Sequence, residues 1–247
     1  MTTIEQLVGL TAQHNEIIKR VGNGSLNPIS VRRAFQDIIE GARKTLSTVE
    51  RVARQIDAWT NLGVEITEER YEQILKAAEA FRPINDTDKP LVTGGFGYDN
   101  PTALVKKFFE VLRPADGYEK SNYIEDTQLR YVSGMRPTGE LRLVHYDSDA
   151  FSGRSPKFAR RKARSDGLRL AGIEVFERVI LEPETGLSWG KVWNSFPNAS
   201  GLNMKDIIGQ SNVPHLYRRN NDRHFEFATH SADVGYHGWS SPVVREC

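Results

Sequence analysis

The densest concentration of charge in this sequence is a run of cationic side chains between residues 154 and 169. Seven lysines and arginines fall within these sixteen residues, and Asp166 is the one acidic residue among them. Because the whole chain has 33 basic and 32 acidic residues, its charge is concentrated in this basic segment rather than spread evenly. Guanidinium groups make bidentate, charge-assisted contacts with phosphates, and several together give salt-dependent affinity for nucleic acid. The basic segment therefore predicts contact with a polyanion through Arg154, Lys157, Arg160, Arg161, Lys162, Arg164 and Arg169.

A second interpretation of the basic segment needs no ligand. Its proline, glycine and serine residues favour a loop between a strand and a helix, and the charge of a solvated loop keeps a protein soluble. Under the first interpretation, in contrast, Phe158 would stack on a base if the partner is nucleic acid. Charge alone does not distinguish nucleic acid from an acidic protein, so both interpretations stay open.

Histidine is the second residue type with a chemical pattern, because four of the six histidines lie between His215 and His237. If residues 223–230 form a strand, its period of two places His224, Glu226 and His230 on one face. Imidazole and carboxylate ligands suit zinc or iron, which gives a metal-site hypothesis on His224 and Glu226. His224 and His230 would be about 20 Å apart along an extended strand, too far to share an ion. The alternative is a half-exposed strand with its phenylalanines in the core.

The glycine-rich stretch GGFGYDNP, residues 94–101, is a third candidate. A glycine loop before a helix N-terminus can hold a phosphate through backbone N–H groups. The Walker pattern requires a lysine and a hydroxyl residue after the glycines, whereas Tyr98, Asp99 and Asn100 follow here. We therefore expect a turn in which Asn100 caps the next helix.

Nucleophilic catalysis has little support in the sequence. No GxSxG motif occurs, and the single cysteine, Cys247, is the last residue, a position that is usually poorly oriented. A single cysteine excludes an intramolecular disulfide and agrees with a reducing compartment. The sequence thus identifies no catalytic residue, substrate or cofactor.

The elements expected to position these residues change in character along the chain. Apolar residues recur every three or four positions in the first ninety residues, which predicts helices over 4–18, 28–40, 47–62 and 67–81. The polar, proline-bounded segment 83–90 is typical of a linker. A strand or glycine loop over 91–97, a helix from Pro101 to Leu112 and a helix over 170–181 are expected next. Alternating residues predict two hairpins, 127–133 with 140–146 and 213–219 with 223–230.

These elements predict an α+β fold, with a bundle-like helical region at 1–83 followed by a mixed region of antiparallel hairpins and packed helices at 90–247. Whether these are two domains or one continuous domain is left open. No apolar run reaches the ~18 residues of a membrane helix, and the first twenty residues do not resemble a secretory signal. A cytoplasmic protein without a membrane partner is expected.

Residues 24–41, GSLNPISVRRAFQDIIEG, together with 213–219 and 240–247, resemble an uncharacterised protein family of reduced-genome bacteria. The resemblance covers these stretches alone and implies a soluble bacterial protein, with no activity, cofactor or catalytic residue attached.

Three functional hypotheses follow. The first is a non-enzymatic binding protein whose basic loop at 154–169 contacts nucleic acid or another polyanion. The second is a metal-dependent or hydrolase-like enzyme centred on the histidine-rich C-terminal hairpin. The third is a protein–protein interaction module that uses the N-terminal helices.

Overall fold

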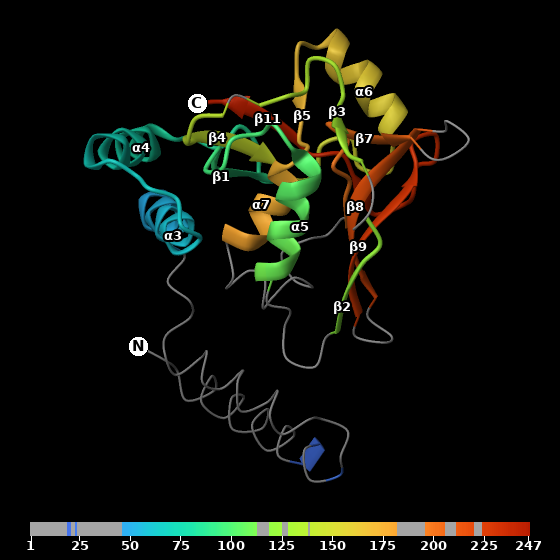
Figure 1. Cartoon of the computed structure of the whole chain (residues 1–247), viewed down its shortest axis with the longest axis horizontal. Coiled ribbons are helices and arrows are strands. Elements are labelled where there is room, and N and C mark those ends of the chain that lie inside the picture. The colour runs from blue at the N-terminus through green and yellow to red at the C-terminus, as the bar shows by residue number, and fades with distance from the viewer. Residues whose placement is uncertain are drawn as a thin grey trace, which may run out of the picture. The chain divides into compact units, whose positions relative to one another are not determined.

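The computed structural model describes residues 46–112, 119–124, 128–137, 139–181, 196–205, 211–219 and 224–247, together with residues 19, 20 and 23. The chain divides into two compact units, Met1–Ser47 and Thr48–Cys247, and almost all described residues belong to the second (Figure 1). The predicted helices at 4–18 and 28–40, and with them the interaction hypothesis for the N-terminal helices, lie outside the described residues.

The fold of the second unit is α+β, as the sequence predicts. Its described helices are α3 (Thr48–Asn61), α4 (Glu68–Ala80), α5 (Pro101–Val111), α6 (Pro156–Ser165) and α7 (Glu174–Leu181). Its described strands are β1 (Asp88–Thr93), β2 (Glu119–Asn122), β3 (Arg130–Tyr131), β4 (Arg142–Asp147), β5 (Arg169–Leu170), β6 (Phe196–Pro197), β7 (Leu202–Lys205), β8 (Ser211–Arg219), β9 (His224–Ser231), β10 (Trp239–Ser240) and β11 (Val243–Glu246). None of these described helices has the length and apolar character needed to cross a bilayer.

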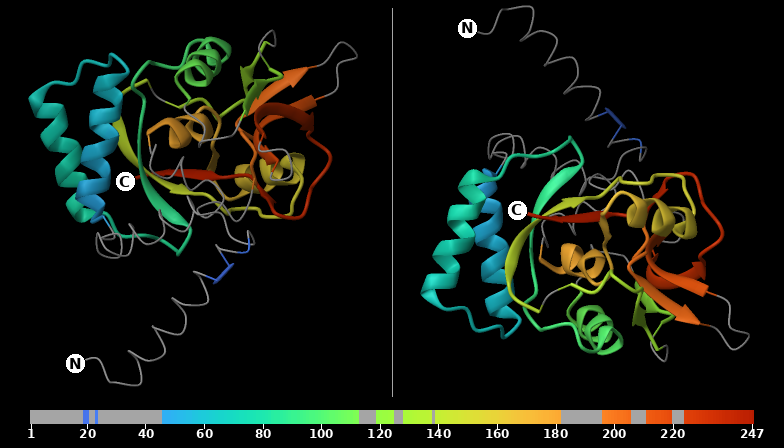
Figure 2. Two further views of the ribbon diagram at one scale, coloured as in Figure 1. Left: turned by 90° about the horizontal axis from the view of Figure 1, so that it is seen from below. Right: turned by 90° about the horizontal axis from the view of Figure 1, so that it is seen from above.

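The strands form two main sheets. One has the order β1-β4-β11-β5 with antiparallel pairing throughout, and the other has the order β2-β9-β8-β7-β3. A short parallel pair joins β10 to β6. Figure 2 shows α3 and α4 at one end of the unit, beside β1 and β4, and the β8–β9 hairpin at the other end.

One predicted hairpin is confirmed and the other is wrong. Strands β8 and β9 pair antiparallel from Arg219↔His224 outward, as expected. The segments 127–133 and 140–146 do not pair with each other, because β3 pairs with β7 in one sheet and β4 pairs with β1 and β11 in the other. Alternation along a strand reports a half-buried surface and carries no information about the partner strand.

The predicted cap at Asn100 is confirmed, and Thr67 caps the helix expected at 67–81 in the same way. The Thr67 side chain accepts a hydrogen bond from the backbone N–H of Arg70 at 3.3 Å and begins α4. Asn100 does the same for the N–H of Ala103 at 3.0 Å and begins α5. Both caps satisfy N–H groups that a helix leaves without an internal partner.

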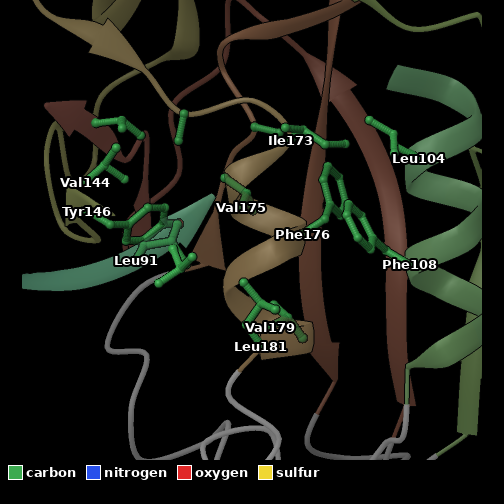
Figure 3. Packing of buried hydrophobic residues seen from close by; sticks show 14 of the residues in the cluster. Leu91, Leu104, Phe108, Val144, Tyr146, Ile173, Val175, Phe176, Val179 and Leu181 are labelled. Atoms are coloured by element: carbon green, nitrogen blue, oxygen red, sulfur yellow. The ribbon is translucent and has the colours of Figure 1, made fainter. Parts of the chain in front are cut away.

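Helix α7 forms the centre of the hydrophobic core. Figure 3 shows Val175 and Val179 of α7 on the side of Leu91 and Tyr146 of the four-stranded sheet, whereas Phe176 points toward α5. The Phe176 ring also lies 4.9 Å from the ring of Phe227 in β9. A single short helix therefore joins the two sheets and α5 into one core.

Helix α3 covers the open edge of β1. The Gln55 side-chain amide donates to the carbonyl of Pro90 at 3.1 Å and accepts from the N–H of Val92 at 2.7 Å, while the Trp59 indole donates to the carbonyl of Val92 at 3.0 Å. These side chains take the place of a further strand and satisfy the backbone of β1 at this point.

The segment 83–90 is folded structure rather than a linker. Asn85 accepts from the N–H of Asp88 at 2.9 Å and donates to the carboxylate of Asp147 at 2.9 Å, and Asp88 already belongs to β1. Asp88 is fully buried and lies 2.6 Å from Nδ1 of His145. The polar residues that suggest a linker are therefore engaged in hydrogen bonds.

Candidate polyanion-binding surface

Most of the basic segment, residues 156–165, forms helix α6, so the expectation of a loop is wrong. Ser155 accepts from the N–H of Phe158 at 3.2 Å, and Pro156 occupies the first helical position of α6. Ala159 and Ala163 are fully buried in a small core with residues of β5 and β11. The apolar stripe of α6 is thus made of alanines one turn apart, a weak signal among so many cations.

Arg160 anchors this helix instead of facing a ligand. Its guanidinium donates to the carbonyl of Ser200 at 3.0 Å, to Oγ of Ser211 at 3.1 Å and to the carbonyl of Leu202 at 2.7 Å. Burial lowers the pKa of Arg160 to about 10, which leaves it charged at neutral pH. All three nitrogens have partners within the fold, so Arg160 leaves the candidate surface.

Arg169 leaves the candidate surface for a similar reason. It lies on β5, beyond the end of α6, and its guanidinium forms an ion pair with the buried carboxylate of Glu174. Glu174 also accepts from the N–H of Gly172 at 2.9 Å. This charge is therefore used to join β5 to α7.

The remaining five cations of the basic segment are exposed, and we call them the α6 cations. Lys157 pairs with Asp233 at 2.7 Å, and Lys162 pairs with Asp166 at 2.7 Å on the helix surface. Arg161 and Arg164, the other two exposed cations on the helix, have no ion pair with a described residue. The α6 cations are Arg154, Lys157, Arg161, Lys162 and Arg164.

An exposed aromatic ring lies within this charge. The guanidinium of Arg154 lies 5.4 Å from the ring centroid of Phe158, whose exposed fraction is 37%. The geometry is that of a cation–π pair on the first turn of α6. This pair gives the basic surface a flat apolar element.

The loop that follows β9 packs directly on the N-terminus of α6. The N–H of Lys157 donates to the carbonyl of Ala232 at 2.8 Å, and the N–H of Gly153 donates to the carbonyl of Trp239 at 2.7 Å. A Cβ at Gly235 would lie 2.7 Å from the backbone nitrogen of Ser155, so only glycine fits at this contact. Residues far apart in sequence are brought together here (Figure 2).

A group of aromatic and imidazole rings lies next to this contact. Trp239 is its centre, with ring centroids 4.5 Å from His215, 4.8 Å from His230 and 4.7 Å from Tyr236. The Tyr217 ring lies 6.0 Å from that of Trp239. We call these five residues the aromatic cluster.

The two histidines of the aromatic cluster are neutral at physiological pH. Burial and the neighbouring His230 lower the pKa of His215 to about 3, and burial also lowers the pKa of His230. Nε2 of His230 lies 2.8 Å from Oδ1 of Asn198. The Nδ1 atoms of both rings are buried without a hydrogen-bond partner among the described residues.

The metal hypothesis on His224 and Glu226 gains no further ligand. The side chain of His224 lies outside the described residues, whereas Glu226 is 8% exposed and faces Tyr217 across the β8–β9 pair. No group of three or more histidine, cysteine or acidic residues in the described part of the chain is arranged to hold a metal ion. The structure instead brings His215 and His230 together, with their ring centroids 5.1 Å apart.

The sequence contains a partial signal for the aromatic cluster. His215 and Tyr217 share one face of β8 by the period of two, and His230 lies on the facing strand. The contribution of Trp239 and Tyr236 has no such signal, since the loop beyond β9 brings them back over the sheet.

A second buried polar group lies in the core and is closed to solvent. Glu177 of α7 accepts hydrogen bonds from Thr93 and, at 3.1 Å, from the hydroxyl of Tyr98. Burial, reinforced by Glu174, raises the pKa of Glu177 to about 8. The glycine-rich stretch 94–101 is thus a turn that sends Tyr98 into the core. Glu174, Glu177 and Arg178, the charged residues of α7, are all buried.

No protein-family model, curated protein or solved structure matches the chain.

Proposed function

We propose that the protein is a cytoplasmic binding protein that contacts a polyanion through the α6 cations. The observation that carries this proposal is that α6 separates the cations of the basic segment into a buried anchor and an exposed set. Arg160 is committed to three hydrogen bonds that fix α6 to β7 and β8, while five cations stay on the exposed side. A fixed helix presents its charges at constant spacing, which costs less conformational entropy on binding than a mobile loop.

The charge balance around α6 supports an anionic partner. Asp166 and Asp233 are the acidic residues paired with the α6 cations, so five positive charges face two negative ones. Arg161 and Arg164, three residues apart, project from neighbouring positions on one helix face. A phosphate chain that binds there releases counterions, and its affinity falls as salt rises.

The test is a pair of charge reversals that change net charge equally. Arg161→Glu reverses an α6 cation, and Lys76→Glu reverses an exposed cation on α4, at the other end of the unit. Binding of fluorescein-labelled oligonucleotide and of inorganic polyphosphate is measured by anisotropy between about 50 and 200 mM salt. We expect Arg161→Glu to weaken both at least ten-fold and to flatten the salt dependence, with Lys76→Glu unchanged.

Two results would contradict the proposal. One is the absence of binding to either probe at the lowest salt concentration. The other is an equal loss of affinity in the two variants, because that would show an effect of net charge rather than of the α6 surface.

A further inference from the structure

The aromatic cluster reaches the protein surface beside the α6 cations. Tyr236 is 45% exposed, and Gly235 before it is packed against the backbone of Arg154 and Ser155. Phe158, with the Arg154 guanidinium over its ring, lies on the first turn of the same helix. Exposed rings and exposed cations therefore occupy one continuous region built from α6 and the loop 232–239.

We propose that the polyanion is single-stranded nucleic acid, with its phosphates on the α6 cations and its bases on Tyr236 and the aromatic cluster behind it. This inference rests on the proposed function and names its ligand class. Nonspecific single-strand binding combines a cationic groove or surface with aromatic rings on which successive bases stack. Both components are present here within one tertiary contact.

The charge state of the aromatic cluster favours bases over phosphates. His215 and His230 are neutral at physiological pH, so the rings behind Tyr236 add apolar area without positive charge.

Asp233, the acidic residue of the loop 232–239, forms an ion pair with Lys157. This pairing reduces the repulsion between Asp233 and a phosphate chain that passes from α6 toward Tyr236. The backbone bonds from Lys157 to Ala232 and from Gly153 to Trp239 hold the loop in register with the helix. The stacking surface is thus preorganised, which reduces the entropy lost on binding.

Single strands fit this surface better than duplexes or acidic proteins. The bases of a duplex are stacked on each other, so their faces are not available to Tyr236. An acidic peptide has carboxylates for the α6 cations but no flat ring for the aromatic cluster. Tyr236 therefore distinguishes single-stranded nucleic acid from the other partners, whereas the α6 cations attract any polyanion.

The experiment compares Tyr236→Ala, Tyr236→Phe and Tyr123→Ala. Tyr123, next to β2, is 63% exposed and is the matched control for loss of a surface tyrosine. The probes are a labelled single-stranded oligonucleotide of about 12 nucleotides, the same sequence as a duplex, polyphosphate and polyglutamate of equal charge. Each is titrated over a series of salt concentrations.

We expect Tyr236→Ala to weaken single-strand binding by about five-fold or more, the loss of one stacked base. Its salt slope and its affinity for polyphosphate should match those of the unmodified protein, because the α6 cations are all retained. Tyr236→Phe should keep the affinity, since the stacking ring remains. Arg161→Glu, in contrast, should lower the salt slope by about 0.7 for each phosphate that the protein no longer neutralises.

Other outcomes overturn the inference. If Tyr236→Ala binds the single strand as tightly as the unmodified protein does, bases do not stack on Tyr236, and the polyanion function stands without the stacking surface. Equal binding of duplex or of polyglutamate would assign the partner to another class. Failure of every probe at low salt would instead contradict the proposed function itself, so the two failures are distinguishable.

Discussion

Nη2 of Arg160 donates a hydrogen bond of 2.7 Å to the backbone carbonyl of Leu202, and this bond ties helix α6 to the first residue of β7. The same guanidinium reaches Ser200 and Ser211, so one side chain fixes the helix to the turn before β7 and to the start of β8. The basic helix is therefore held by the most buried of its own cations, while the α6 cations face solvent.

Replacing Arg160 by Met should destabilise the protein by about 2–4 kcal/mol, because two buried carbonyls lose their donors. Met retains most of the aliphatic volume, so the loss reports the hydrogen bonds rather than a cavity. Urea denaturation measures the change. Arg161→Met is the control and should change stability by less than about 0.5 kcal/mol, as expected at an exposed site. Equal stability of the two variants would contradict the anchoring role.

Replacing Gln55 by Leu should cost about 2 kcal/mol or more, since the N–H of Val92 and the carbonyl of Pro90 would remain buried without their side-chain partner. Thermal unfolding checks this expectation. Gln73→Leu on the exposed side of α4 removes a glutamine whose bonds are at the surface, and it should have little effect. A Gln55→Leu protein as stable as the Gln73→Leu protein would show that the edge of β1 does not need covering.

Replacing Glu177 by Gln should change how stability depends on pH. The folded-state pKa of about 8 lies above the ordinary value of 4.5, so between these values the folded state retains a proton that the unfolded state has lost. This group therefore contributes stability that is fully present at acidic pH and is lost as pH rises from about 4.5 to about 8. Unfolding measured at intervals across that range should show a decline in the unmodified protein that Glu177→Gln reduces.

The histidines of the aromatic cluster change the pH dependence of stability in the opposite direction. Their contribution cancels when the unmodified protein is compared with Glu177→Gln. The lowered pKa of His215 means that its contribution is lost as pH falls from 6.5 to about 3. Because both proteins retain His215, their difference isolates Glu177. Identical pH profiles for the two proteins would place the Glu177 carboxyl at an ordinary pKa.

Replacing Gly235 by Ala should separate the loop 232–239 from α6. Its Cβ would lie 2.7 Å from the nitrogen of Ser155 and 2.9 Å from the carbonyl carbon of Arg154, so the backbone must move at a cost of about 1–3 kcal/mol. Gly139→Ala is the control, since its Cβ meets no atom closer than 3.5 Å. We expect Gly235→Ala to weaken single-strand binding as well as stability. If Gly235→Ala binds the oligonucleotide as tightly as the unmodified protein does, the packing of the loop on α6 is not needed for binding.

Much of the secondary structure could be predicted because its signals are local. Thr67 and Asn100 cap helices where the sequence indicates, and the β8–β9 hairpin forms between the expected residues. The inward residues Val52, Ile56 and Trp59 of α3 follow from the helical period. Each of these features depends on residues within a few positions of one another.

The candidate surface could be predicted only in part. The charge of residues 154–169 is visible in the sequence, but the helix that sorts it depends on two alanines that fill a small space against β5 and β11. That Arg160 points inward is decided by carbonyls about forty residues further along the chain. The meeting of Trp239 with His215 depends on the path of the loop after β9, which no local pattern encodes.

Local backbone preferences and composition are enough to predict the α+β class, the helix caps, the C-terminal hairpin and the concentration of positive charge. In contrast, the strands that pair with β4, the carboxylates that are buried and the arginine that anchors α6 are known only from the three-dimensional fold. Those outcomes depend on long-range packing, in which a polar side chain is buried wherever a distant segment supplies its hydrogen bonds. The surface shared by α6 and the aromatic cluster is of this second kind.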